Sequence, residues 1–382
     1  MDQVLEALRT SAGMLWKALW ALIFGYTISA GIQVLVTRQQ MAKALGERGA
    51  KEASLAGFLG FISSSCSFAA LAASRAVFVK GAHATNAIAF LIASTNLVIE
   101  LGIVLWVLVG WRFTLGNFVL GTAMIVYAYL LTRWFFPSRL AEQARERGAE
   151  AEAEGGMEME AGVAGSWRDK LAAPETWQRI ARAFFMEWKM VWKEILFGFT
   201  VAGLISVFVP QSFWNALFLI SGQGGGPDPD PGFLTVLQNA LVAPVVAFFT
   251  FIGSMGNVPL AAMLWSRGAS FGGVMSFLGA DLVAATVVWV HAKYYGWRYA
   301  GYLSGLLYVS MVAAGVTVHY LFAAVGKIPR ERPELREMVR FGVDYTLFLN
   351  LAFLGVAAVL LWLWLRGRRS GGAGEAVAPG RR

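Results

Sequence analysis

The sequence contains one pattern of residues twice, once in each half of its 382 residues. The matched segments keep their order, with offsets of 173 to 187 residues: 21–31 with 194–203, 80–82 with 267–269, 90–91 with 277–278, 96–98 with 281–283, and 110–112 with 296–298. A repeat of this length predicts two structural units of related fold. The chain is therefore expected to form two similar halves that pack against each other.

Both halves are strongly apolar. Hydrophobic residues make up 57% of the chain and charged residues 15%, whereas soluble domains keep about a quarter of their residues charged. A helix needs about 20 apolar residues to cross the hydrocarbon of a bilayer. Runs of that kind predict membrane-spanning helices near 14–36, 85–110, 113–136, 191–210, 271–293, 299–325 and 342–365. The expected fold is an all-α polytopic membrane protein with two homologous repeats.

The charge pattern and the cysteine count exclude several classes of protein. The net charge of +8 is carried by loops and tails, as in membrane proteins with basic cytoplasmic loops. We therefore expect the lipid bilayer, and not nucleic acid, as a partner. The single cysteine excludes an internal disulfide and a CxxC metal clip, and we expect no metal or cofactor. The run 14–36 is too long for a cleavable signal, so we expect a multi-pass protein of the cell inner membrane.

Two further apolar stretches are interrupted at corresponding places in the two halves. In 52–79 the polar run 63–67 lies between apolar flanks, and in 233–266 the run 253–257 precedes Pro259. Backbone groups freed at membrane depth are tolerated only where protein packs around them or where they line a wet cavity. The matching interruptions therefore predict broken or re-entrant helices at the centre, where transporters place their binding sites.

The positions of basic residues predict that the repeats are inverted. Loop 37–51 has four basic residues and its counterpart 211–232 has none, which puts the first loop inside and the second outside. Inversion requires 52–79 and 233–266 to be re-entrant hairpins. Loop 326–340, with five basic residues, would then lie outside against the rule. If both interrupted stretches instead cross the membrane fully, the repeats are parallel.

The same patterns divide the chain into five regions. A polar linker rich in Ala, Glu and Arg separates the halves, and we read it as a solvated helix followed by a flexible stretch. The regions are the first transmembrane repeat (1–136), the cytoplasmic charged linker (137–190), the second transmembrane repeat (191–325), a loop with the final transmembrane helix (326–366), and a disordered tail (367–382).

The polar run of the first half contains the candidate ligands Cys66, Ser64, Ser65 and Ser67. A thiolate at a helix break is a soft ligand for a thiophilic solute, and the hydroxyls could bind an anion or solvate freed backbone. A buried cysteine is also common as a small apolar filler, and serine is tolerated inside helices by bonding to the preceding turn. The clustering of serines around one cysteine favours a site.

A second set of candidates is repeated between the halves. Asn96 and Asp281 align, each followed by Leu-Val, and Glu100 lies one turn beyond Asn96 on the same helical face. Ionisable groups within spans are costly and mark function or pairing. Asp281 is the expected proton-coupling residue with Glu100 as a weaker candidate, and a helix cap is the competing role for Asp281. Ser254 and Asn257 in the second interruption complete the expected binding residues.

The order of these motifs resembles a known family. Segments 65–71, 80–82 and 87–91, followed by a second copy at 253–260, 267–269 and 276–281, resemble the predicted permease family that includes the organoarsenical exporters, over about residues 14–325. The family's Gly-Pro-Ala-Thr-Asn motif is replaced here by Ala93-Ser94-Thr95-Asn96 and by Gly279-Ala280-Asp281. Met255 lies near the place where some relatives have a second cysteine, so paired thiol ligation is absent.

The resemblance implies a permease, and not an enzyme, that exports a trivalent organoarsenical or a related thiophilic solute. A carrier of a small inorganic or sulfur-containing anion is the alternative, and a membrane scaffold that uses the linker 137–190 is a third reading. The sequence has no Walker motif, so we expect coupling to an ion gradient, with protons as the expected ion. The sequence does not determine the oligomeric state, and a homo-oligomer is one of the possibilities.

Overall fold

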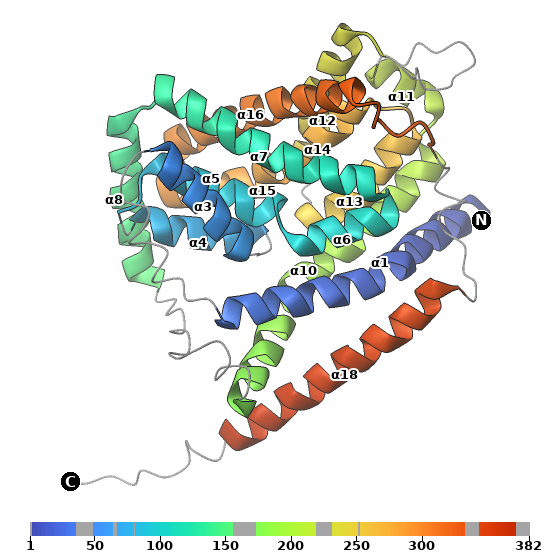
Figure 1. The fold of residues 1–382 in the computed structure, drawn as a ribbon, viewed down its shortest axis with the longest axis horizontal. Coiled ribbons are helices and arrows are strands. Elements are labelled where there is room, and N and C mark those ends of the chain that lie inside the picture. The colour runs from blue at the N-terminus through green and yellow to red at the C-terminus, as the bar shows by residue number, and fades with distance from the viewer. Residues whose placement is uncertain are drawn as a thin grey trace.

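The computed structural model describes residues 2–35, 49–63, 67–79, 81–155, 173–218, 231–250, 253–332 and 344–371, and every regular element in these ranges is a helix (Figure 1). The elements are α1 (Asp2–Leu35), α3 (Ala50–Ser63), α4 (Ser67–Val79), α5 (Ala84–Asn96), α6 (Ile99–Leu108), α7 (Trp111–Trp134), α8 (Ser138–Gly155), α10 (Pro174–Phe208), α11 (Gln211–Leu217), α12 (Phe233–Thr250), α13 (Ser254–Ser266), α14 (Phe271–Leu278), the 3₁₀ helix η1 (Gly279–Val283), α15 (Ala285–Tyr295), α16 (Trp297–Ala324) and α18 (Tyr345–Gly371). The predicted all-α polytopic class is confirmed.

Seven segments of the described chain are long and apolar enough to cross a membrane: Ala84–Leu108, Trp111–Trp134, Val191–Phe208, Phe233–Thr250, Phe271–Tyr295, Trp297–Ala324 and Tyr345–Gly367. They match six of the seven expected spans. The expected span 14–36 is part of the longer helix α1 and does not meet this criterion. In its place is α12, the first part of the interrupted stretch 233–266, which is long enough to cross by itself.

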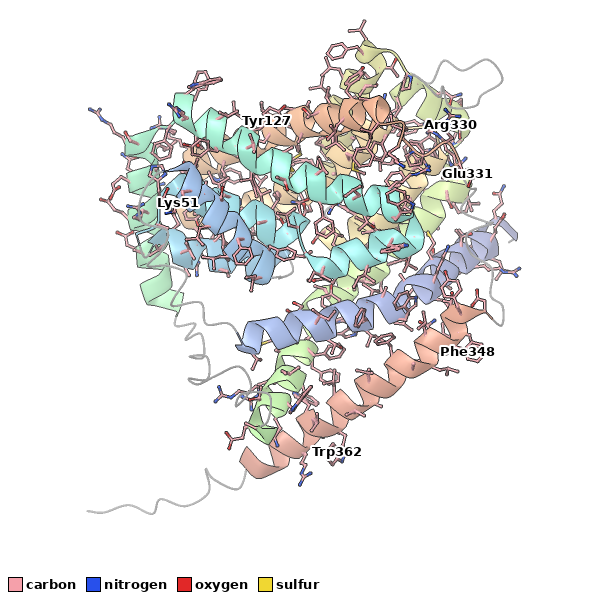
Figure 2. All side chains as sticks on the ribbon, in the orientation of Figure 1. Lys51, Tyr127, Arg330, Glu331, Phe348 and Trp362 are labelled. Atoms are coloured by element: carbon pink, nitrogen blue, oxygen red, sulfur yellow. The ribbon has the colours of Figure 1, made fainter. Side chains whose placement is uncertain are left out.

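α1 and α10 form a closely packed antiparallel pair, and α18 packs against both. Gly203 of α10 lies against Ser11 of α1, and at the other end of the pair Ser29 donates a hydrogen bond to Glu187 Oε1 at 2.9 Å. α18 lies along the outside of the bundle (Figure 1). Phe348 and Trp362 project from it (Figure 2) and are 64% and 56% exposed, as expected for side chains that contact lipid.

The two halves show the same order of packing. α5 packs against α3 and α7, and α14 packs against α12 and α16. Glycine takes a positive φ at matched turns: 107° at Gly81 and 106° at Gly268, then 107° at Gly110 and 85° at Gly296. Side chains rarely adopt this region, so these glycines allow the sharp turns between helices. The homologous repeat and its inversion both stay predictions.

Two spans predicted as continuous are broken, which corrects the expected helices 85–110 and 271–293. α5 ends at Asn96 and α6 begins after Val98, which has an extended backbone with ψ of 142°. In the second half η1 follows α14, and Ala284 is extended with ψ of 144° before α15. Both runs are strongly apolar and contain no proline, so neither hydropathy nor a proline indicated the breaks. The Asn96 carbonyl freed by the first break accepts a hydrogen bond from Asn117 of α7, which lies far away in sequence.

The linker region is more firmly packed than a solvated helix. α8 lies at one end of the bundle (Figure 1) and contacts α4, α15 and α16. Arg145 donates a hydrogen bond to the Ala82 carbonyl at 2.9 Å and lies 5.0 Å from the ring centroid of Phe78. Ala144 is 1% exposed. After the residues that the structure does not describe, α10 begins at Pro174, so the helix expected at 191–210 starts about five turns earlier.

Candidate functional site at the helix breaks

The predicted ligands of the first interruption fall outside the part of the chain that the structure describes. Ser64, Ser65 and Cys66 lie between α3 and α4 and are not described. Ser67 is the first residue of α4, and its side chain is also outside the description. The predicted interruption agrees with the end of α3 at Ser63 and the start of α4 at Ser67.

Asn96 lies at the first broken span and is fully buried. Its Nδ2 donates to Thr95 Oγ1 at 3.1 Å, and its backbone carbonyl accepts from Asn117 Nδ2 at 2.6 Å. The Oδ1 atoms of Asn96 and Asn117 have no hydrogen-bond partner within the described residues. Buried amide oxygens without partners are uncommon and call for an explanation. This break therefore has spare capacity to accept hydrogen bonds.

Asp281 lies at the corresponding break of the second half. It is part of η1 and is fully buried. η1 packs against α5 and α7 as well as against its own half. On α7, Gly121 contacts the Asn96 side chain, and Met124 contacts Gly279 beside Asp281. One turn of α7 thus touches both breaks, and the structure brings the predicted pair of residues into one region.

Glu100 has a different setting from Asn96 and Asp281. It lies in the first turn of α6, where a carboxylate interacts favourably with the helix dipole. The side chain is 2% exposed, and its Cβ packs directly against Gly25 of α1. A side chain on Gly25 would overlap Glu100, so the glycine allows α1 and α6 to approach closely. Glu100 is therefore at the α1–α6 contact.

The second interruption places Ser254 and Asn257 in the first turn of α13. α12 ends at Thr250, and Gly253 precedes the first residue of α13. Ser254 is 7% exposed and Asn257 is fully buried. Neither polar atom of the Asn257 side chain has a hydrogen-bond partner within the described residues. Pro259 lies inside α13 and does not end the helix. Gly253 is extended, with ψ of −179°, so the break includes the first residue of the predicted run 253–257.

One carboxylate near this site was not among the predicted residues. Glu194 on α10 lies within the apolar span Val191–Phe208 and contacts Gly253 at the start of α13. One turn later Gly198 contacts Gly256, where a Cβ would lie 2.6 Å from the Gly256 Cα. The sequence signal was available, since an acidic residue inside an apolar run is unusual. Its position beside α13 depends on tertiary packing.

Arg332 is a partly buried charged group with a structural role. Arg332 donates hydrogen bonds to the carbonyls of Trp265 and Ala269 at 3.1 and 2.9 Å, and its guanidinium lies 3.9 Å from the Trp265 ring. Burial lowers the pKa of Arg332 to about 10, so it stays cationic near neutral pH. Within the described residues, no group of three or more His, Cys, Asp or Glu side chains could hold a metal ion.

These features define a multi-pass α-helical membrane protein with buried polar residues at paired helix breaks. The comparisons with known proteins give its family. Residues 3–320 match a family described as predicted permeases, and the chain belongs to that family. It is 41% identical over 332 residues to the Mycobacterium tuberculosis (strain H37Rv) protein named "Putative permease Rv2963". The aligned residues cover 86% of this chain and 80% of that protein. No solved structure matches the chain significantly.

Proposed function

We propose that this permease is a secondary carrier of the cell inner membrane that exports a small thiophilic solute such as a trivalent organoarsenical. The observation that supports it best is the pair of broken spans, with Asn96 and Asp281 fully buried at the breaks and touched by the same turn of α7. Transporters bind solutes and coupling ions at such discontinuous helices. The amide oxygens of Asn96 and Asn117 are buried without a partner among the described residues, which is uncommon in a purely structural bundle.

The proposed binding residues come from both halves. Cys66 supplies a thiolate for the thiophilic atom, and Ser64, Ser65 and Ser67 supply hydroxyls. Asn96, Ser254, Asn257 and Asp281 add polar atoms at the breaks. The protein carries the solute across the lipid bilayer, and the proposed mechanism uses no metal or cofactor. A scaffold built on the linker is less well supported, because α8 uses one face to pack on its own bundle.

Methylarsenite transport tests the role of the thiol. Everted membrane vesicles with the wild-type protein should accumulate methylarsenite, and Cys66→Ser should reduce the initial rate at least tenfold. Ser54→Ala is the control, because Ser54 is exposed and bonds only to the Ala50 carbonyl of its own helix. Wild-type rates in Cys66→Ser would leave the thiol with a packing role. Failure of the wild type with methylarsenite but uptake of sulfite or thiosulfate would favour the anion carrier.

Asp281→Asn tests the proposed proton coupling. The substitution keeps the shape of the side chain and removes its charge, and a charge within a span costs about 2.5–3.5 kcal/mol on insertion scales. If Asp281 couples transport to protons, the variant should bind methylarsenite but lose accumulation driven by a pH gradient. Normal accumulation would leave Asp281 as a helix cap. Glu100→Gln, measured in the same vesicles, tests the weaker candidate.

A further inference from the structure

Glu194 is a carboxylate inside a membrane-spanning segment, and the described residues give it no counter-ion. It lies on α10 within Val191–Phe208 and is half-buried. Within the described residues it has no hydrogen-bond or ion-pair partner. Ionised groups in such surroundings are costly and are retained when they pair, bind ligands or carry protons.

The start of α13 is shaped to receive this carboxylate. A Cβ at Gly253 would overlap Oε2 of Glu194, so the carboxylate would have to move aside for any larger residue. Gly198 and Gly256 touch one turn further along both helices, where any Cβ on Gly198 would meet the Gly256 backbone. The contact between Gly198 and Gly256 thus brings α10 close to α13 and places Glu194 beside the start of α13.

Asn257 provides a second, independent sign of a site at this place. Its backbone N–H bonds to the Gly253 carbonyl at 3.1 Å, so the two residues are one helical turn apart on the same face of α13. The side chain is fully buried, and neither Nδ2 nor Oδ1 has a partner in the described part of the chain. A buried polar group without a partner costs about 1–3 kcal/mol. That cost is removed if the amide binds a ligand or a carboxyl group in another step of the cycle.

Charged groups on the elements packed against α10 are engaged elsewhere. α13 has no ionisable residue from Ser254 to Ser266, and α18 has none from 346 to 365. On α1, Lys17 interacts electrostatically with Asp344. The other charged residues of α1 precede Ser11, which contacts the Thr200 carbonyl beyond Glu194 along the antiparallel pair.

The ionisable neighbours on α10 itself, and Tyr26 of α1, also have their own contacts. Glu187 accepts a hydrogen bond from Ser29, Lys193 lies near the ring of Trp192, and Tyr26 packs edge-on against Trp188. The charge of Glu194 is therefore not neutralised by a side chain that the structure describes. A proton or a bound cation must do this whenever water is excluded from the site.

We propose that Glu194 is a proton-exchange residue of the transport cycle, with its carboxylate against Gly253 and the unpartnered amide of Asn257 one helical turn further along α13. A hard metal cation fits less well, because such ions take six or more oxygen ligands, whereas the described polar side chains here are the Glu194 carboxylate, the Asn257 amide and the Ser254 hydroxyl. Glu194 takes up one proton when the site closes to water and returns it when the site opens.

Infrared difference spectroscopy tests proton binding without any solute. A pH step on the purified wild-type protein in lipid nanodiscs should give the carbonyl band of a protonated carboxyl group. One component of this band should vanish in Glu194→Gln and persist in Glu175→Gln, which alters an exposed glutamate at the start of the same helix. Identical bands in wild type and Glu194→Gln would overturn the proposal.

A second variant keeps the Glu194 carboxylate but fills the space beside Gly253 that it occupies. Gly253→Ala should shift the pH midpoint of the same band by at least one pH unit, because the added methyl group displaces Glu194. Gly305→Ala, where the methyl group meets nothing within 4 Å, should leave the midpoint unchanged. An unchanged midpoint in Gly253→Ala would contradict the contact on which the proposal stands, even if Glu194→Gln failed to fold.

Transport measurements then test the role in the cycle, and this arm rests on the proposed function. Glu194→Gln vesicles should lose at least tenfold in methylarsenite accumulation driven by a pH gradient, while methylarsenite exchange at equal pH stays within twofold of wild type. Accumulation at the wild-type level would reject the coupling role. If wild-type vesicles do not transport methylarsenite, the proposed substrate fails, and the infrared experiment alone decides whether Glu194 exchanges protons.

Discussion

At the scale of single residues, glycines decide where helices of this protein can touch. Gly25 admits Glu100, Gly198 admits Gly256, and Gly253 admits Glu194. In each case a Cβ would meet atoms of a neighbouring helix. Close approach of backbones is a common way to pack helices in lipid, where burial of apolar surface gives little driving force.

Gly198→Ala should destabilise the protein by about 1–3 kcal/mol, the usual cost of overpacking. The added methyl group would lie 2.6 Å from the Cα and carbonyl oxygen of Gly256, and a backbone cannot rotate away as a side chain can. Gly305→Ala should be neutral or stabilising by up to about 1 kcal/mol, because alanine is the better helix former and its methyl group has open space. Thermal unfolding in detergent compares the two variants, and equal melting temperatures would contradict the close contact.

Asn117→Leu should cost about 1–3 kcal/mol, because it leaves the buried Asn96 carbonyl at the break between α5 and α6 without its donor. Thr122→Ala on the same helix is the matched control. Its hydroxyl is exposed and bonds only to the Phe118 carbonyl of α7 itself. Chemical denaturation in mixed micelles can rank the variants. A loss in Thr122→Ala as large as in Asn117→Leu would show that the break does not depend on Asn117.

At the scale of elements, α8 connects the two halves at one end of the bundle. Its Gly148 packs against Val79 of α4 and Tyr295 of α15, and Arg147 lies against Gly296 at the turn into α16. Arg145 reaches the Ala82 carbonyl between α4 and α5. The helix therefore holds segments from both halves, although its sequence is polar.

Arg145→Ala should loosen α8 more than Arg139→Ala. Arg145 loses a charge-assisted hydrogen bond, worth about 1.5–3 kcal/mol, and its cation–π contact with Phe78, worth about 0.5–1 kcal/mol. Arg139 is exposed on the same helix. Hydrogen–deuterium exchange of residues 138–150 should become at least tenfold faster in Arg145→Ala only. Equal exchange in both variants would mean that the hydrogen bond to Ala82 does not hold α8.

At the scale of the whole molecule, the orientation of the halves decides which loops share a side of the membrane. The inverted arrangement requires loops 37–51 and 211–232 on opposite sides. α12 is long enough to cross the membrane by itself, which suits parallel repeats, while the basic residues favour inversion. Arg332, one of the basic residues that contradict the inverted reading, is bound to Trp265 and Ala269. Its charge therefore serves packing and gives little evidence about sidedness.

Single cysteines can settle the orientation. On a Cys66→Ser background, Gln223→Cys should react with an impermeant maleimide added to intact cells, and Gln39→Cys should react only after permeabilisation. This outcome follows if loop 37–51 stays inside because of its four basic residues. Equal labelling of both cysteines in intact cells would support parallel repeats.

Much of the fold could be predicted from local sequence. Six of the expected spans are present, two of them as broken helices. They could be predicted because a segment that crosses hydrocarbon needs a run of about 20 apolar residues. The positions of Asn96 and Asp281 in matched segments also indicated that they share a role. Wrong were the two continuous spans that contain them, and the solvated helix expected in the linker also packs one face on the bundle. Those features depend on Asn117 and on the Arg145 contacts with Ala82, which join residues far apart in the chain.

The sequence by itself determined that this chain is a helical membrane protein with interruptions in both halves. Long apolar runs suit the hydrocarbon of a bilayer, and polar residues that interrupt such runs can be recognised in the sequence. Only the tertiary structure decided which polar groups meet. One turn of α7 lies against both the break at Asn96 and the break at Asp281, and Glu194 lies beside Gly253 because glycines let α10 and α13 touch. Such contacts depend on the angle and separation of packed helices, which no single segment encodes.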